Sequence, residues 1–123
     1  MENVEPRFEC DDEINTCVIY FGNDMCEEES TIVLSALAND YQGYDKFIVV
    51  IPDPFEVCES FRIQIHRYIL AKRKTDPSFR IAVVTTLLKV IGYERFAKTV
   101  IGMIEREQIF DTLDEAIEWI KNE

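Results

Sequence analysis

Histidine and glycine are scarce in this sequence, which has one histidine and four glycines in 123 residues. Nucleophilic catalysis needs a nucleophile, a base and an orienting group within mutual reach. The single histidine, His66, falls in the middle of a predicted helix, as a partly exposed residue. A phosphate-binding loop needs clustered glycines, whereas these are isolated: Gly22, Gly43, Gly92 and Gly102. We therefore expect no enzyme activity and no cofactor.

Long apolar runs are also missing. The longest run, 47–51, is far shorter than the roughly 20 residues that a membrane helix needs. The amino terminus is acidic and lacks the hydrophobic segment of a secretory signal. These absences predict a cytoplasmic protein without a membrane span.

Without an export signal, we expect all four cysteines to be free thiols in a reducing compartment. The spacing contains no C-x-x-C pair, which together with the single histidine argues against a zinc site. Cys10 and Cys17 flank a short polar loop and could face each other across a hairpin. Two interpretations of that pair stay open, a redox-active pair or two small buried apolar side chains. The other two cysteines are Cys26 and Cys58.

Basic residues are rare in the first third of the chain. Residues 1–45 contain twelve acidic side chains and one base, Arg7, and the net charge of the chain is −11. A protein that binds nucleic acid needs a positively charged surface, so we expect no nucleic-acid partner. The acidic first half could instead steer a basic protein partner toward this chain. A basic cluster follows, which is either a solvated helix face or a contact for an acidic partner or headgroup: Arg62, His66, Arg67, Lys72, Arg73, Lys74 and Arg80.

What the sequence does contain is an alternation of β-rich runs and helical periodicity. Predicted strands cover 8–10, 16–21, 47–51, 79–84 and 108–110, and predicted helices follow the second to fifth of these strands. Capping-box spacing, Asp24 with Glu27 and Thr112 with Glu115, predicts the starts of the first and last helices. The third helix is predicted over 89–107. Strands joined by helices indicate an α/β fold, with a mostly parallel five-stranded sheet after an antiparallel first hairpin.

Polar residues at the predicted carboxyl ends of the strands are the first candidate site. Asp53 follows the third strand, where open α/β sheets often bind ligands, but it also lies between two prolines, where a turn-forming aspartate is common. Thr85 and Thr86 leave the fourth strand at the same edge, either as ligand contacts or as caps.

Two segments of the carboxyl-terminal half carry a resemblance to a known family. Gly92 and Arg95 fit a G-x-x-R turn that leads from a strand into a helix, and a second motif matches at Phe110, Leu113, Glu115, Ala116 and Trp119. This half resembles SpoIIAA-like (STAS-like) proteins, over about a third of the chain. The length fits one domain over 1–123, and the pattern predicts the order β-β-α-β-α-β-α-β-α. The resemblance implies a small sheet with helices packed on it, akin to anti-sigma-factor antagonists and CRAL-TRIO lipid-binding domains.

The family's regulatory motif is present only in part. In the antagonists a D-S-S-G motif after the central strand carries a phosphoserine, whereas residues 55–61 contain one serine and no glycine. Ser60 is therefore a candidate phosphoacceptor or, alternatively, the N-cap of the second helix, and nearby acids would repel an added phosphate. Gly92 is expected to have a positive φ or to allow a close backbone approach. Arg95 would bind an anion or form a structural ion pair.

The resulting expectation is a non-enzymatic regulatory or protein-interaction module that binds a protein partner or forms a homodimer. The alternative is a domain that binds a small apolar or lipid-like ligand, as the CRAL-TRIO kinship implies. The alternative requires that the aromatic side chains line a cavity rather than fill the core: Phe47, Phe55, Phe61, Tyr68 and Phe96.

Overall fold

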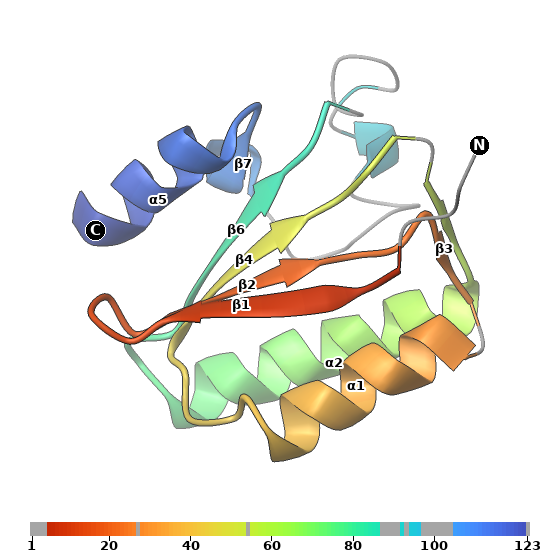
Figure 1. The fold of residues 1–123 in the computed structure, drawn as a ribbon, viewed down its shortest axis with the longest axis horizontal. Helices are drawn as coiled ribbons and strands as arrows, with labels where there is room; N and C mark the ends of the chain where they lie inside the picture. Colours follow the sequence, from red (N-terminus) through yellow and green to blue (C-terminus); the bar gives the residue numbers. More distant parts are fainter. Residues whose placement is uncertain are drawn as a thin grey trace.

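The computed structural model describes residues 5–26, 28–53, 55–86, 92, 94–96 and 105–122. Five strands form one sheet in the order β1-β2-β4-β6-β7, in which β1 is antiparallel to β2 and the other pairs are parallel (Figure 1). The predicted α/β class, the mostly parallel five-stranded sheet and the antiparallel first hairpin are thereby confirmed. The strands are β1 (Arg7–Asp11), β2 (Thr16–Tyr20), β4 (Lys46–Val50), β6 (Arg80–Val84) and β7 (Ile109–Phe110).

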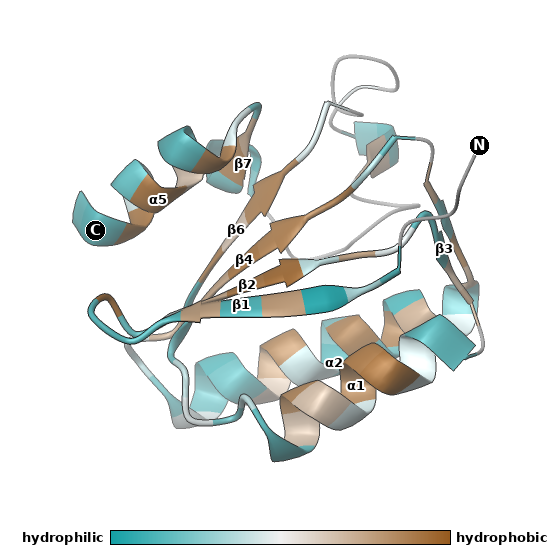
Figure 2. Ribbon diagram, viewed as in Figure 1, coloured by the Kyte–Doolittle hydropathy of each residue, from teal (hydrophilic) through white to brown (hydrophobic). Residues whose placement is uncertain are grey.

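Helices cover both faces of this sheet. Helices α1 (Glu28–Asn39) and α2 (Glu59–Thr75) lie side by side on one face, and α5 (Leu113–Asn122) lies on the other (Figure 1). The alternation of side chains along a strand divides the core accordingly. Phe47 and Val49 pack toward α1 and α2, while Ile48 packs toward α5. The apolar sides of the helices accordingly face the sheet (Figure 2).

The start of α5 follows the prediction closely. The Glu115 backbone N–H donates to Thr112 Oγ1 at 3.3 Å, and the Thr112 hydroxyl donates to Glu115 Oε1 at 2.9 Å. Thr112 thus provides the N-terminal acceptor that a helix needs for its unpaired N–H groups. One turn further on, Ala116 and Ile120 are buried against the sheet.

A second, two-stranded sheet was not predicted. The parallel strands β3 (Asp24–Met25) and β5 (Glu56–Val57) pair Asp24 with Glu56. The predicted N-cap at Asp24 is therefore wrong, because this residue belongs to a strand and α1 begins only at Glu28. Met25 is fully buried, and its Sδ accepts a hydrogen bond from the Gly22 N–H at 3.3 Å. Burial of Met25 explains why the chain continues as a strand before the helix starts.

The third predicted helix also differs at its end. Residues 94–96 are helical, and most of the rest of the predicted range lies outside the described residues. Glu105 is extended, with φ −77° and ψ 153°, and begins the 3₁₀ turn η1 (Arg106–Gln108), so the helix does not reach 107 as predicted. The Gln108 side chain donates to the Ile81 carbonyl at 2.7 Å, which fixes this turn beside β6.

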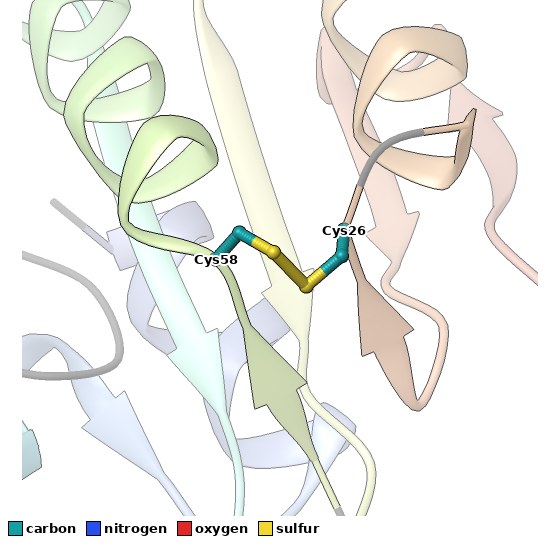
Figure 3. Close-up of a disulfide and its surroundings, with 2 residues drawn as sticks. All are labelled: Cys26 and Cys58. Carbon is teal, nitrogen blue, oxygen red and sulfur yellow. A yellow bond between two sulfur atoms is a disulfide. The ribbon is translucent and has the colours of Figure 1, made fainter.

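Two of the four cysteines form a disulfide, contrary to the expectation of four free thiols. Cys26 follows β3 and Cys58 follows β5, and the bond joins them across 32 positions with a Cα–Cα distance of 5.1 Å (Figure 3). The pairing of β3 with β5 brings the two residues together, which no sequence spacing indicates. Cys10 and Cys17 are free. A cytoplasmic location stays a prediction, but the cysteines no longer support it.

No helix in the described ranges is both long enough and apolar enough to cross a membrane.

We predict that replacing the disulfide in Cys26→Ala/Cys58→Ala lowers the free energy of unfolding by about 3–4 kcal/mol. In the unfolded chain the bond joins two residues that are 32 positions apart, which restricts the conformations of the loop between them. Removing the bond gives the unfolded chain back this conformational entropy and so stabilises the unfolded state. Urea unfolding followed by circular dichroism measures the change, with Cys10→Ala as a control that leaves the bond intact. A loss below about 1 kcal/mol would show that the bond adds little to the pairing of β3 with β5.

Candidate functional site

The carboxyl edge of the parallel strands holds three of the predicted contacts. Asp53 follows β4 and is exposed, and Thr86 follows β6 and is exposed. Thr85 is only 3% exposed, and its N–H donates to the Phe110 carbonyl at 3.0 Å. The backbone of Thr85 therefore continues the pairing of β6 with β7.

The topology brings Asp53 and Thr85 to the same edge of the sheet, beyond β4 and β6. A ligand crevice forms at that edge where neighbouring crossovers leave toward opposite faces. Here the crossovers through α1 and α2 both lie on the same face (Figure 1). The three hollows described below are lined by other side chains.

The residues of the family motif lie further along the chain. Gly92 has φ +81°, as predicted, and a Cβ at this position would meet no atom within 4 Å. The positive φ, and not a close approach, therefore requires glycine here. Arg95 is exposed, one helical turn after Gly92. Its role in binding an anion stays a prediction.

Ser60 is the second residue of α2 and is exposed. The N-cap of this helix is Cys58, which makes no side-chain cap hydrogen bond because its sulfur is held in the disulfide. The predicted N-cap role of Ser60 is therefore wrong. Glu56 and Glu59 are exposed nearby, in the same short segment. Phosphorylation of Ser60 stays a prediction.

A hollow of about 160 Å³ lies where α1 begins, and we call it the acidic hollow. Ile32, half exposed at 50%, and Pro6 are its apolar residues. Glu5, from the segment before β1, and Glu28 and Glu29, from the first turn of α1, supply its charge. The helix dipole favours negative charge in that first turn, which explains how several carboxylates are tolerated together. The hollow thus combines one exposed apolar side chain with three carboxylates.

A second hollow, the α1–α2 groove, lies between the carboxyl-terminal halves of the two helices. It has a volume of about 260 Å³ and is lined by Leu37, Ala38, Gln42, Tyr68, Ala71, Lys72 and Thr75. The Lys72 ammonium donates to the Gln42 carbonyl at 2.5 Å, which places one positive charge in a largely apolar groove. The sequence indicated Lys72 as part of a basic cluster but gave no sign of the groove.

The hydroxyl of Tyr68 is buried and has no hydrogen-bond partner among the residues that the structure describes. Tyr68 also lines an apolar cavity of about 20 Å³ inside the core, which has room for one water molecule. Burial, together with the nearby Cys17, raises the pKa of Tyr68 to about 12. Tyr68 thus connects the core with the α1–α2 groove and remains a neutral hydrogen-bond donor at physiological pH.

The other aromatic side chains that the sequence suggests as possible cavity lining pack in the core. Phe47, Phe61 and Phe96 are each at most 1% exposed, and Phe55 packs partly buried against the same cluster. The 20 Å³ cavity is far smaller than the several hundred Å³ that a ligand pocket takes. The α1–α2 groove, at about 260 Å³, comes closer to that size.

The first cysteine pair faces across the hairpin, as the sequence predicted. Cys10 on β1 lies opposite Cys17 on β2, with the Cys10 thiol donating to Cys17 Sγ at 3.5 Å. Cys17 is fully buried, whereas Cys10 is exposed. The interpretation as two buried apolar side chains is therefore wrong for Cys10. Burial, and then the neighbouring Cys10, raise the pKa of the Cys17 thiol.

Polar contacts hold the tip of this hairpin against the rest of the fold. The Tyr44 hydroxyl donates to Asp12 Oδ1 at 2.5 Å, and the Asn15 amide donates to Asp45 Oδ1 at 2.7 Å. Asp45 also accepts from the Ser78 hydroxyl at 3.0 Å. Burial opposes ionisation of Asp45, but the hydrogen bonds from Lys46, Ser78 and Asn15 hold its pKa below the usual value. Within the described part of the chain, no cluster of three or more potential ligands could hold a metal ion.

The basic cluster lies along α2 and continues to the start of β6. Arg67 and Lys74 are exposed, and the other members are half-buried. Ile63 and Leu70, each 38% exposed, share the helix with them. Nothing in this arrangement distinguishes a solvated face from a contact for an acidic partner, so both interpretations stay open.

We predict that Tyr68→Phe raises the free energy of unfolding by about 1 kcal/mol, because it removes a buried hydroxyl that lacks a partner. Chemical denaturation measures the change. Tyr44→Phe is the matched control, and it should lower stability because its hydroxyl donates to a carboxylate. A destabilised Tyr68→Phe would mean that a molecule in the cavity or groove accepts the hydroxyl proton.

Comparisons with family models, with curated proteins and with solved structures find no significant match to this chain. The SpoIIAA-like resemblance therefore continues to rest on the motifs of the carboxyl-terminal half alone.

Proposed function

We propose that this protein is a non-enzymatic interaction module that docks a basic protein segment in the acidic hollow. The observation that carries the proposal is the half-exposed Ile32 within a hollow that also holds three carboxylates. A regulatory role, as the SpoIIAA-like resemblance implies, fits a domain that acts by binding alone.

The chemistry of the hollow defines the partner segment. Covering the exposed half of Ile32 would contribute about 1–2 kcal/mol of apolar burial. Glu5, Glu28 and Glu29 would meet lysine or arginine on either side of an apolar residue, and such charge complementarity chiefly raises the association rate and the specificity. The segment that fits is therefore an apolar residue flanked by basic ones.

The same charges argue against a homodimer built on this surface. In a symmetric dimer, each patch meets its own copy, so Glu28 and Glu29 would face the carboxylates of the second molecule. Like charges placed together at an interface cost several kcal/mol. A heterologous basic partner is thus preferred over a second copy of this chain.

We expect p-benzoylphenylalanine in place of Ile32 to crosslink a basic partner in the protein's own cells upon irradiation. Mass spectrometry identifies the adduct, and Glu28→Lys/Glu29→Lys in the same chain should reduce its yield at least tenfold. Each of the two reversals also removes a favourable helix-dipole interaction of about 0.3–1 kcal/mol, so circular dichroism must show that the variant remains folded.

The matched control reverses two exposed charges away from the hollow, Glu107→Lys/Asp114→Lys, and should leave the adduct unchanged. If both double variants lose the adduct equally, the loss is caused by the change in net charge and not by the position of the charges. That outcome would contradict the proposal that the partner docks in the acidic hollow. An adduct that forms equally well with the crosslinker at position 114 would contradict it too.

The α1–α2 groove supports a second candidate function, the binding of a small amphipathic anion. Leu37, Ala38 and Ala71 provide apolar surface for a hydrocarbon chain. Lys72 has three N–H donors, of which the Gln42 carbonyl takes one, so its ammonium can still pair with a carboxylate. The Tyr68 side chain lines the same groove. This candidate corresponds to the lipid-like alternative that the family resemblance implies.

We predict that dodecanoate binds the protein and that Ala71→Trp, which fills the groove, weakens binding at least tenfold. Leu70→Trp adds the same side chain at the neighbouring exposed position outside the groove lining, and it should bind dodecanoate normally. Isothermal titration calorimetry measures both. Lys72→Met should weaken dodecanoate but not uncharged dodecanol, and equal affinities of all variants would refute the groove as the site.

A further inference from the structure

Cys10 and Cys17 are directly opposite residues of neighbouring antiparallel strands, with their sulfur atoms 3.5 Å apart. Side chains at opposite positions of such a pair have Cβ atoms about 4.5–5.5 Å apart, and a disulfide needs about 3.5–4.5 Å. Rotation of the two side chains and a small approach of the strands would therefore bring the sulfurs to bonding distance. The pair is close enough to be joined without refolding.

The two thiols differ in access. Cys10 is exposed, so a reagent in solvent reaches its sulfur, whereas Cys17 is fully buried and is reached through Cys10. Burial and the neighbouring Cys10 raise the pKa of Cys17, so Cys17 is the thiol that keeps its proton. Because the two thiols differ in access, Cys10 can react with the oxidant first and Cys17 can then react with the oxidised Cys10. Redox-sensing cysteine pairs combine an accessible thiol and a resolving thiol in the same way.

We propose that Cys10 is a site of oxidation by a small hydroperoxide and that Cys17 converts the product into a Cys10–Cys17 disulfide. In the first step the Cys10 sulfur attacks one peroxide oxygen, the O–O bond breaks, and a sulfenic acid and one water (an alcohol for an organic hydroperoxide) form. In the second step the Cys17 sulfur attacks the Cys10 sulfur, the S–O bond breaks, and a second water leaves with the Cys17 proton. Two thiols are oxidised by two electrons, and one peroxide is reduced.

The surroundings of the hairpin select the class of oxidant. Glu9, Asp11 and Asp12 are neighbours of Cys10 in the sequence and are exposed, and residues 1–45 carry the whole excess of negative charge. An anionic oxidant such as glutathione disulfide is repelled by this field. A neutral hydroperoxide is not repelled, and it is small enough to reach a sulfur between side chains.

The fold around the pair holds both cysteines in register. Tyr44 holds Asp12, and Asp45 holds Asn15, so the tip of the hairpin is anchored on both sides. Phe8, the next residue of β1 on the same face, stacks on Tyr41 with ring centroids 4.5 Å apart. The Cys26–Cys58 bond lies beyond the carboxyl ends of β2 and β4, at the other end of the sheet (Figures 1 and 3). Disulfide exchange between the two pairs is therefore not expected.

The test uses the full chain with Cys26–Cys58 intact and hydrogen peroxide as the oxidant. We expect the intact mass to fall by two hydrogens and peptide mapping to show a Cys10–Cys17 crosslink. In Cys17→Ser the reaction should stop at the sulfenic acid, which dimedone traps at Cys10. Cys10→Ser should remain unoxidised at the same dose, because Cys17 is buried.

Three outcomes would overturn the proposal. The first is Cys10 passing to the sulfinic acid in the unmodified chain without a crosslink. The second is Cys10→Ser losing its remaining thiol as fast as the unmodified chain does, and the third is a crosslink that joins Cys10 to another cysteine. If Cys17→Ser fails to fold, Cys17→Ala provides the same trapping measurement. The test does not depend on the proposed docking function, because it reads only the state of the sulfurs.

Discussion

The fold depends on β4 being buried on both of its faces. Phe47, Ile48 and Val49 are each at most 3% exposed, and they point alternately toward α1 and α2 or toward α5. Burial on both faces requires a neighbouring strand on each edge and a helix layer on each side. The parallel pairing with β2 and β6 and the crossovers through α1 and α2 follow from that requirement.

At the carboxyl edge of the sheet, several of the described residues serve the structure. There β3 pairs with β5, and the Cys26–Cys58 bond joins the segments that lead into α1 and α2. Asp53 is exposed to solvent at that edge, and the backbone N–H of the buried Thr85 pairs with Phe110 of β7. The binding surfaces proposed above lie elsewhere on the domain.

Those surfaces gather around α1. The acidic hollow lies at its start, the α1–α2 groove at its end, and Tyr41, just beyond the helix, belongs to the aromatic contact beside the Cys10–Cys17 pair. Ile32 is the most exposed of the large apolar side chains that the structure describes, and the buried Tyr68 hydroxyl has no hydrogen-bond partner among the described residues. A protein partner at one end of α1 and an amphipathic ligand at the other would use separate surfaces.

The sequence by itself determined the α/β class, the order of the main strands, the Thr112 cap and the opposition of Cys10 to Cys17, because periodicity, capping and a short hairpin are local properties of the chain. The tertiary structure alone decided the β3–β5 pairing, the Cys26–Cys58 bond and the cap of α2 at Cys58 in place of Ser60. It also decided which hollows exist. Each of these depends on residues distant in sequence that meet only after the helices have packed on the sheet, and neither composition nor spacing contains that information.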